Sequence, residues 1–71
     1  MGFPLRADAV RPGDLLEIDG QEVAVKWVGP AGPLLPRHCK LTGEYPDGRY
    51  FVAYPRNDHP MTVAAQLEPN A

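Results

Sequence analysis

Apolar and polar residues alternate along five short segments of this chain, with the period of two that is typical of β-strands. Glycine, proline and aspartate gather between these segments, where turns are expected. The alternation predicts strands over Asp14–Ile18, Gln21–Val28, Arg37–Thr42, Arg49–Tyr54 and Met61–Leu67. Nine prolines leave no room for a long helix, so a single helical turn is expected near Arg6–Val10.

The first two strands are predicted to form a hairpin. Asp19-Gly20 joins them, and this pair favours a two-residue type I′ turn because both positions need positive φ. Pro12-Gly13-Asp14 makes a tight turn into the first strand, where the Asp14 carboxylate is expected to bond backbone amides.

The same period assigns side chains to the two faces of each strand. Within the second strand, Val23, Val25 and Trp27 are predicted to share one face. In the third strand Cys39 and Leu41 share a face, and in the fourth Tyr50, Val52 and Tyr54 do. The fourth strand is apolar on both faces, since Phe51 and Ala53 lie opposite its tyrosines. This strand is therefore either central in the sheet or turned towards a partner.

These elements predict an all-β fold, a small five-stranded antiparallel SH3-like barrel with at most one short helical turn. A chain of 71 residues makes one domain, 1–71, with flexible ends expected at 1–9 and 68–71. A core of this size supplies roughly 3–5 kcal/mol of stability. The lone Cys39 adds no internal disulfide, so turn chemistry must help.

Val10–Gly20, with its Pro-Gly-Asp turn, alternating strand and Asp-Gly hairpin, resembles the start of SH3-like barrels in the translation-protein and KOW-like group. It looks most like the N-terminal domain of elongation factor P, and Lys40-Leu41-Thr42-Gly43 extends the likeness. In that family, a lysine in the loop after the second strand reaches the ribosomal active site. The matching stretch here, Gly29–Pro33, has no lysine, so the resemblance implies the barrel and not the activity.

Charge is uneven along the chain. The net charge of −2 argues against a nucleic-acid binder that uses its whole surface. The segment 37–56 nevertheless carries four cations against two acids, so a face built from this segment would be mildly basic. The cations that would contact nucleic acid are Arg37, Lys40, Arg49 and Arg56.

Catalytic groups are sparse, and we predict that the protein is not an enzyme. The chain has no serine, and Cys39 is in phase with Leu41, which favours a buried structural thiol. His38 points away from Cys39 on a strand, and Asp58-His59 lies in a loop. No metal site and no cofactor are predicted. A small enzyme or ligand binder built on Cys39, His38 or His59 is the weakest alternative.

The aromatic residues carry the functional prediction. Tryptophan and tyrosine are frequent in binding hot spots. The predicted partner-binding residues are Trp27, Tyr45, Tyr50, Tyr54, Arg49 and Arg56, beside the proline-stiffened loop Gly29–Pro36. The alternative for Trp27 is a place in the barrel core.

We therefore expect a non-catalytic protein-interaction module, a monomer or weak homodimer, whose partner is another protein. Nucleic-acid or ribonucleoprotein binding through the basic aromatic face, with Arg37 and Lys40, is the alternative. The sequence has no apolar run long enough to span a bilayer and no signal-peptide pattern at its start, so we expect no membrane association and a cytoplasmic location.

Overall fold

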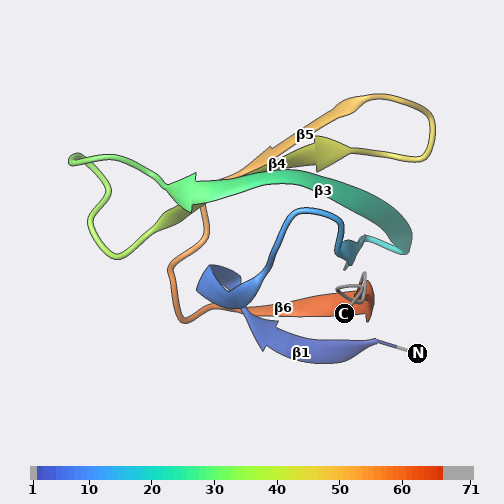
Figure 1. Cartoon of the computed structure of the whole chain (residues 1–71), viewed down its shortest axis with the longest axis horizontal. Coiled ribbons are helices and arrows are strands. Elements are labelled where there is room, and N and C mark those ends of the chain that lie inside the picture. The colour runs from blue at the N-terminus through green and yellow to red at the C-terminus, as the bar shows by residue number, and fades with distance from the viewer. Residues whose placement is uncertain (1, 67–71) are drawn as a thin grey trace, which may run out of the picture.

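The computed structural model describes residues 2–66 of the chain, which form one antiparallel sheet and a single turn of 3-10 helix. The strands follow the order β1-β6-β2-β3-β4-β5 across the sheet (Figure 1). The elements are β1 (Phe3–Arg6), η1 (Ala7–Ala9), β2 (Leu15–Ile18), β3 (Gln21–Pro30), β4 (Cys39–Glu44), β5 (Tyr50–Ala53) and β6 (Pro60–Ala65). The predicted helical turn is confirmed as η1.

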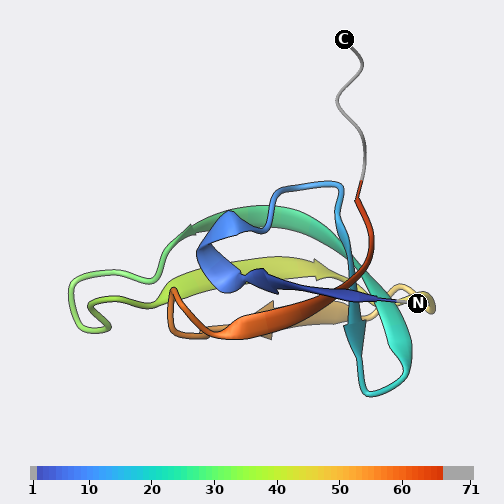
Figure 2. The same cartoon turned by 90° about the horizontal axis from the view of Figure 1, so that it is seen from below.

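The sheet folds over on itself, because the long strand β3 belongs to both of its halves. Residues Gln21–Ala24 of β3 pair with β2, and the stretch from Ala24 to Pro30 pairs with β4. Figure 2 shows β1 and β6 lying across β3 and β4, so that the two halves enclose the core. The buried apolar residues are Ala7, Val10, Leu16, Val23, Val25, Cys39, Leu41, Phe51, Met61 and Val63.

The all-β class is confirmed, but the number of strands is six rather than five. The additional strand, β1, pairs with β6 from Phe3↔Val63 to Arg6↔Pro60. It lies within residues 1–9, which the sequence led us to expect as a flexible end. The segment 68–71, the other expected flexible end, lies outside the described residues. Because β1 is an edge strand, it accommodates Pro4, which has no N–H for a ladder.

Closure of the sheet into a barrel is not confirmed. β1 and β5 are the two edges of the sheet, and no pairing joins them within residues 2–66. The architecture is therefore an open and strongly curved antiparallel sheet, whose two faces differ in character: one lines the core and the other faces outward.

Two turn predictions are confirmed. Asp19 and Gly20 both have positive φ, 49° and 79°, as a type I′ hairpin requires. Asp14 is buried, and its Oδ2 accepts a hydrogen bond of 2.9 Å from the Arg11 amide. Its carbonyl oxygen also accepts the Val25 N–H at 2.9 Å, which ties the Pro-Gly turn to β3.

A β-bulge in the middle of β3 changes the face on which Trp27 lies. Val25 pairs with Gly43 and Trp27 with Thr42, so two residues of β3 span one step of β4 and Lys26 is the extra residue. The bulge places both Lys26 and Trp27 outside and returns Val28 towards the core. The prediction that Trp27 shares a face with Val23 and Val25 is therefore wrong.

Candidate functional site

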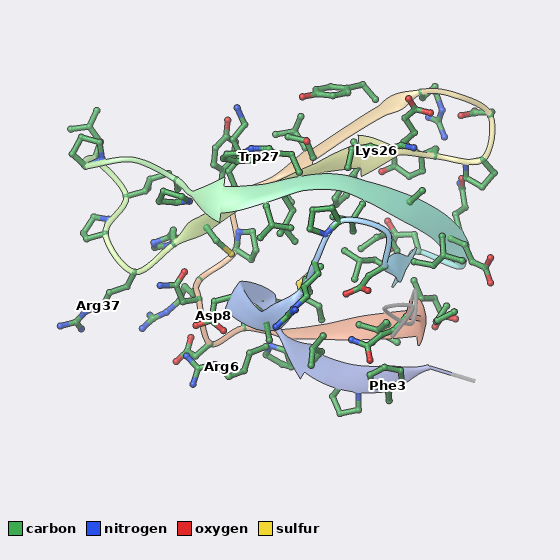
Figure 3. The ribbon with its side chains drawn as sticks, viewed as in Figure 1. Phe3, Arg6, Asp8, Lys26, Trp27 and Arg37 are labelled. Carbon is green, nitrogen blue, oxygen red and sulfur yellow. The ribbon has the colours of Figure 1, made fainter. Side chains whose placement is uncertain are left out.

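The outward face of β3, β4 and β5 carries most of the exposed apolar surface of the sheet. Trp27 is 47% exposed, Tyr50 69%, Val52 39% and Tyr54 48%. Trp27 and Lys26 lie on the side of β3 turned away from η1 and β6 (Figure 3). We call this surface the aromatic face, and its residues are Trp27, Lys40, Thr42, Tyr50, Val52 and Tyr54.

Strand register brings the centre of the aromatic face together. Trp27 pairs with Thr42 on β4, and Thr42 pairs with Val52 on β5, so the three residues form one row across the sheet. Thr42 points outward but is buried, because its row neighbours flank it on both sides. The centre of the face is therefore apolar and shields its one hydroxyl group.

Gly29 makes room for the indole of Trp27 along β3. A Cβ at position 29 would overlap the Trp27 ring and lie 2.6 Å from its Cζ2 atom. The ring thus rests over the backbone of Gly29, and the packing holds it against the sheet. A flat ring fixed in this way presents its outer surface without having to be ordered on binding.

Alternation on β5 supplies the second side of the aromatic face. Phe51 is buried and Ala53 packs against the core, so Tyr50, Val52 and Tyr54 point outward. The predicted alternation is confirmed, and the strand lies at an edge of the sheet rather than at its centre. The Nζ atom of Lys40 lies 5.9 Å from the centroid of the Tyr54 ring, within range of a cation–π contact. Lys40 thus adds one positive charge beside an exposed ring.

Tyr45 and Arg49 lie elsewhere, at the turn between β4 and β5. Tyr45 is half-buried and packs edge-on against Phe51, with ring centroids 5.7 Å apart. The Arg49 guanidinium covers Tyr45 at 4.7 Å from the ring centroid, and its Nε donates to Asp47 at 2.7 Å. Hydrogen bonds from the backbone and side chain of Arg49 lower the pKa of Asp47. These contacts build the turn and leave little of the Tyr45 ring for a partner.

The four cations considered for nucleic-acid contact do not converge on one surface. Lys40 belongs to the aromatic face, whereas Arg49 lies at the β4–β5 turn. Arg37 and Arg56 line a hollow at the opposite end of these strands. In Figure 3, Arg37 lies below the ribbon of β3, on the side opposite Trp27. Arg49 and Arg56 also have acidic neighbours, Asp47 at 2.7 Å and Asp58 at 3.6 Å.

The sequence singled out Tyr50 and Tyr54 as partner-binding residues but not Lys26 or Thr42, although the alternation places both of these opposite the apolar face of their strands. Val52 was on the predicted face, although only aromatic and basic residues were assigned to partner binding. An unbroken period of two puts Lys26 outside and Trp27, the largest side chain of the chain, inside, so the sequence pattern gives no sign of the bulge.

The candidate catalytic residues His38 and Cys39 line one hollow with Asp8, but no hydrogen bond joins any two of these side chains within residues 2–66. Cys39 is buried, and the Nδ1 atom of His38 lies 2.9 Å from the carbonyl oxygen of Pro36. Asp58 pairs with Arg56 rather than with its neighbour His59. Within residues 2–66, no three His, Cys, Asp or Glu side chains are grouped so that they could hold a metal ion.

Burial raises the pKa of the Cys39 thiol above its ordinary value of 9.0, and the negative charge of Asp8 adds to the effect. The folded protein therefore keeps this proton at a pH where the unfolded chain loses it. We expect the free energy of unfolding to fall as the pH rises past 9.0, by more in the wild type than in Cys39→Ala. Urea titrations at pH 7.5 and 10 measure this, and parallel losses in the two proteins would contradict it.

No helix within the described residues is long and apolar enough to cross a membrane.

Comparison with known proteins identifies a fold and no family. No protein-family model matches the sequence, and no curated protein matches it. Among solved structures, a translation initiation factor eIF-5A family protein from Naegleria fowleri is similar, with a TM-score of 0.72 and 18% sequence identity. The match covers 87% of this chain and 46% of that one, so this chain spans less than half the length of that protein. At this identity, the likeness establishes a shared β fold.

Proposed function

We propose that this protein is a non-catalytic interaction module, of the SH3-like type found in translation factors, that binds a partner protein through the aromatic face. The observation that carries the proposal is the β-bulge at Lys26. It places Trp27 outside, in one row with Thr42 and Val52 and beside Tyr54 and Lys40. An apolar centre with a charged rim is the usual anatomy of a protein–protein interface.

The charges favour a protein partner over nucleic acid. Phosphate contacts dominate nucleic-acid affinity, and they need cations that are free to make them. Arg49 is hydrogen-bonded to Asp47 at 2.7 Å, and Arg37 and Arg56 line a hollow away from the aromatic face. The aromatic face therefore has Lys40 as its cation, with Lys26 next to it on β3, so apolar burial by the rings is the larger source of binding energy there.

Single-stranded nucleic acid is the second candidate ligand. Lys40 lies over Tyr54 beside the exposed Trp27 ring, and bases stack on such rings while cations neutralise the backbone. The structural neighbour is named as a translation initiation factor family protein, which is consistent with this candidate.

A photo-crosslinking residue at position 54 tests the main proposal. In the source cells, we expect Tyr54→benzoylphenylalanine to give a discrete covalent adduct with one protein, and the adduct should persist after nuclease treatment. The matched control is the same replacement at Phe3, which is also aromatic and 40% exposed but lies on β1. Identical adducts from both positions, or no protein adduct from position 54, would refute the proposal.

The fluorescence of Trp27 separates the two ligand classes, since it is the only tryptophan of the chain. Base stacking on Trp27 would quench its emission, so the main proposal predicts no saturable quenching by a single-stranded oligonucleotide at low salt. Saturable quenching that weakens steeply with added salt would contradict the main proposal and identify single-stranded nucleic acid as the ligand class.

A further inference from the structure

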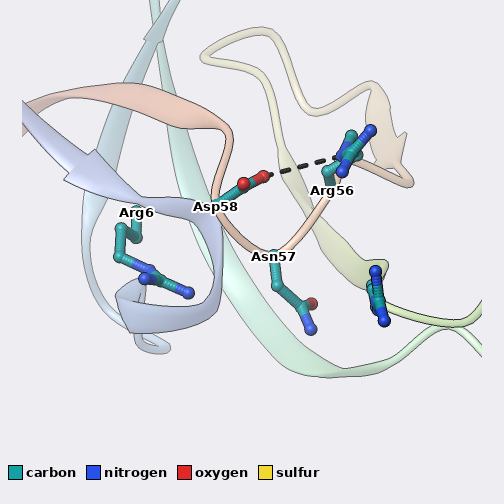
Figure 4. Close-up of a pocket in the computed structure, with 5 residues that line it drawn as sticks. Arg6, Arg56, Asn57 and Asp58 are labelled. Carbon is teal, nitrogen blue, oxygen red and sulfur yellow. Dashed lines mark ion pairs between the residues drawn. The ribbon is translucent and has the colours of Figure 1, made fainter.

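Three arginine side chains from distant parts of the chain surround one open hollow of about 230 Å³ (Figure 4). Arg6 ends β1, Arg37 comes shortly before β4, and Arg56 lies between β5 and β6. Asn57 and Asp58 complete the lining. This hollow is separate from the aromatic face, and the proposed function makes no use of it.

Backbone hydrogen bonds fix the three segments relative to one another. The Asn57 N–H donates to the Arg37 carbonyl at 2.8 Å, and the Asn57 carbonyl accepts the Asp8 N–H at 3.1 Å. His59 donates to the Arg56 carbonyl at 3.0 Å. The main chain that carries each arginine is therefore held in place without any help from the guanidinium groups.

The hollow has an excess of positive charge. Arg6 makes two hydrogen bonds to Asp8, of 3.0 and 2.9 Å, and these raise its pKa. Arg56 is 3.6 Å from Asp58, which is too long for a hydrogen bond. Arg37 has no ion pair within residues 2–66. Three cations thus stand against two carboxylates, and two of the guanidinium groups have donors available.

Arg37 also occupies a backbone conformation that arginine disfavours. Its φ is 61°, in the left-handed region where glycine or asparagine costs least. The arginine side chain brings no compensating ion pair within the described residues. Strain of this kind at a non-glycine residue points to a use for the side chain.

We propose that the hollow binds a phosphate-sized oxyanion, either free phosphate or the phosphoryl group of a small phosphorylated compound. Guanidinium groups suit this ligand because their planar fork can donate two parallel hydrogen bonds to its oxygens. Arg37 and Arg56 supply the donors, and Arg6, held by Asp8, adds a fixed charge. Asp58 opposes the ligand, because its carboxylate lines the same hollow and competes for Arg56.

Backbone amide NMR shifts of residues 37 and 56–58 test the proposal, in titrations with sodium phosphate against sodium chloride at equal ionic strength and pH 7. We expect saturable shifts with phosphate alone. A parallel titration with adenosine monophosphate separates the two sources. Equal affinity for phosphate and adenosine monophosphate means that the site contacts the phosphoryl group alone. Higher affinity for adenosine monophosphate means that the site also contacts the attached nucleoside.

Two substitutions give effects of opposite sign. Arg37→Asn removes the guanidinium but tolerates positive φ, so the fold should persist while phosphate affinity falls at least about tenfold. Asp58→Asn removes the opposing carboxylate and should raise the affinity severalfold. The control is Arg11→Asn, at an exposed arginine away from the hollow. It should change neither the fold nor the affinity for phosphate. Linear shifts, equal shifts with chloride, or full affinity in Arg37→Asn would each overturn the proposal.

Discussion

Gly43→Ala is expected to remove most of the free energy of unfolding of the protein. Gly43 is buried in β4 opposite Val25, at the step where β3 bulges. A Cβ at this position would overlap the carbonyl oxygen of Ala24 and lie 3.2 Å from the Cα of Val25. Both atoms belong to the backbone of β3, so no side chain can turn aside to relieve the contact. We expect a loss of at least about 3 kcal/mol, at the upper end of overpacking effects.

Urea unfolding followed by far-ultraviolet circular dichroism measures this loss. Gly20→Ala is the matched control, because nothing lies within 4 Å of its added Cβ and only its φ of +79° opposes the change. The control should lose about 1–2 kcal/mol, the cost of a left-handed conformation. If Gly43→Ala has a midpoint equal to that of the control, the contact with β3 is not the dominant effect.

Leu41→Ala should also remove most of the stability of the protein. Leu41 is fully buried on β4, between Val28 of β3 and Ala53 of β5. Shortening a buried leucine to alanine costs about 2–5 kcal/mol, because the protein loses the transfer free energy of the removed atoms and is left with a cavity. A core of this size contributes roughly 3–5 kcal/mol in total, so the loss approaches the whole.

The comparison for Leu41 is Val52→Ala, on the outward face of the neighbouring strand. Val52 is partly exposed, and its truncation should cost less than about 1 kcal/mol. Thermal unfolding of the two variants gives the ranking directly. Equal destabilisation by both would mean that the core does not lie where the curved sheet encloses it.

Local signals predicted much of the fold because they depend on a few adjacent residues. Rules that involve only neighbouring residues predict the Asp19-Gly20 turn, the hydrogen bond to the Asp14 carboxylate and the alternation of β5. Edge strand β1 escaped prediction because Phe3–Arg6 is only four residues long and contains a proline. Its pairing depends on β6, which lies more than fifty residues away in the sequence. The open edges likewise depend on the path of the whole sheet.

The candidate site was predictable as a set of residue types and not as a surface. Tyr50 and Tyr54 were assigned to one face correctly, because regular pairing surrounds them. Tyr45 and Arg49 looked equivalent to them in the sequence but stack on each other at a turn. Arg6, which the sequence led us to expect at the start of a helical turn near a flexible end, lies beside Arg37 and Arg56 in space. Such groupings arise from chain folding, which a linear pattern does not record.

The extra residue in β3 has a consequence for how this protein can change over generations. Lys26 and Trp27 both lie on the outward face of the sheet. Substitutions at these positions therefore alter the outward surface, while Val23 and Val25 keep their places in the core. Loss of the single codon for Lys26 would restore a regular strand and still leave the tryptophan outside. The outward side of β3 can therefore change in sequence with little loss of folding stability.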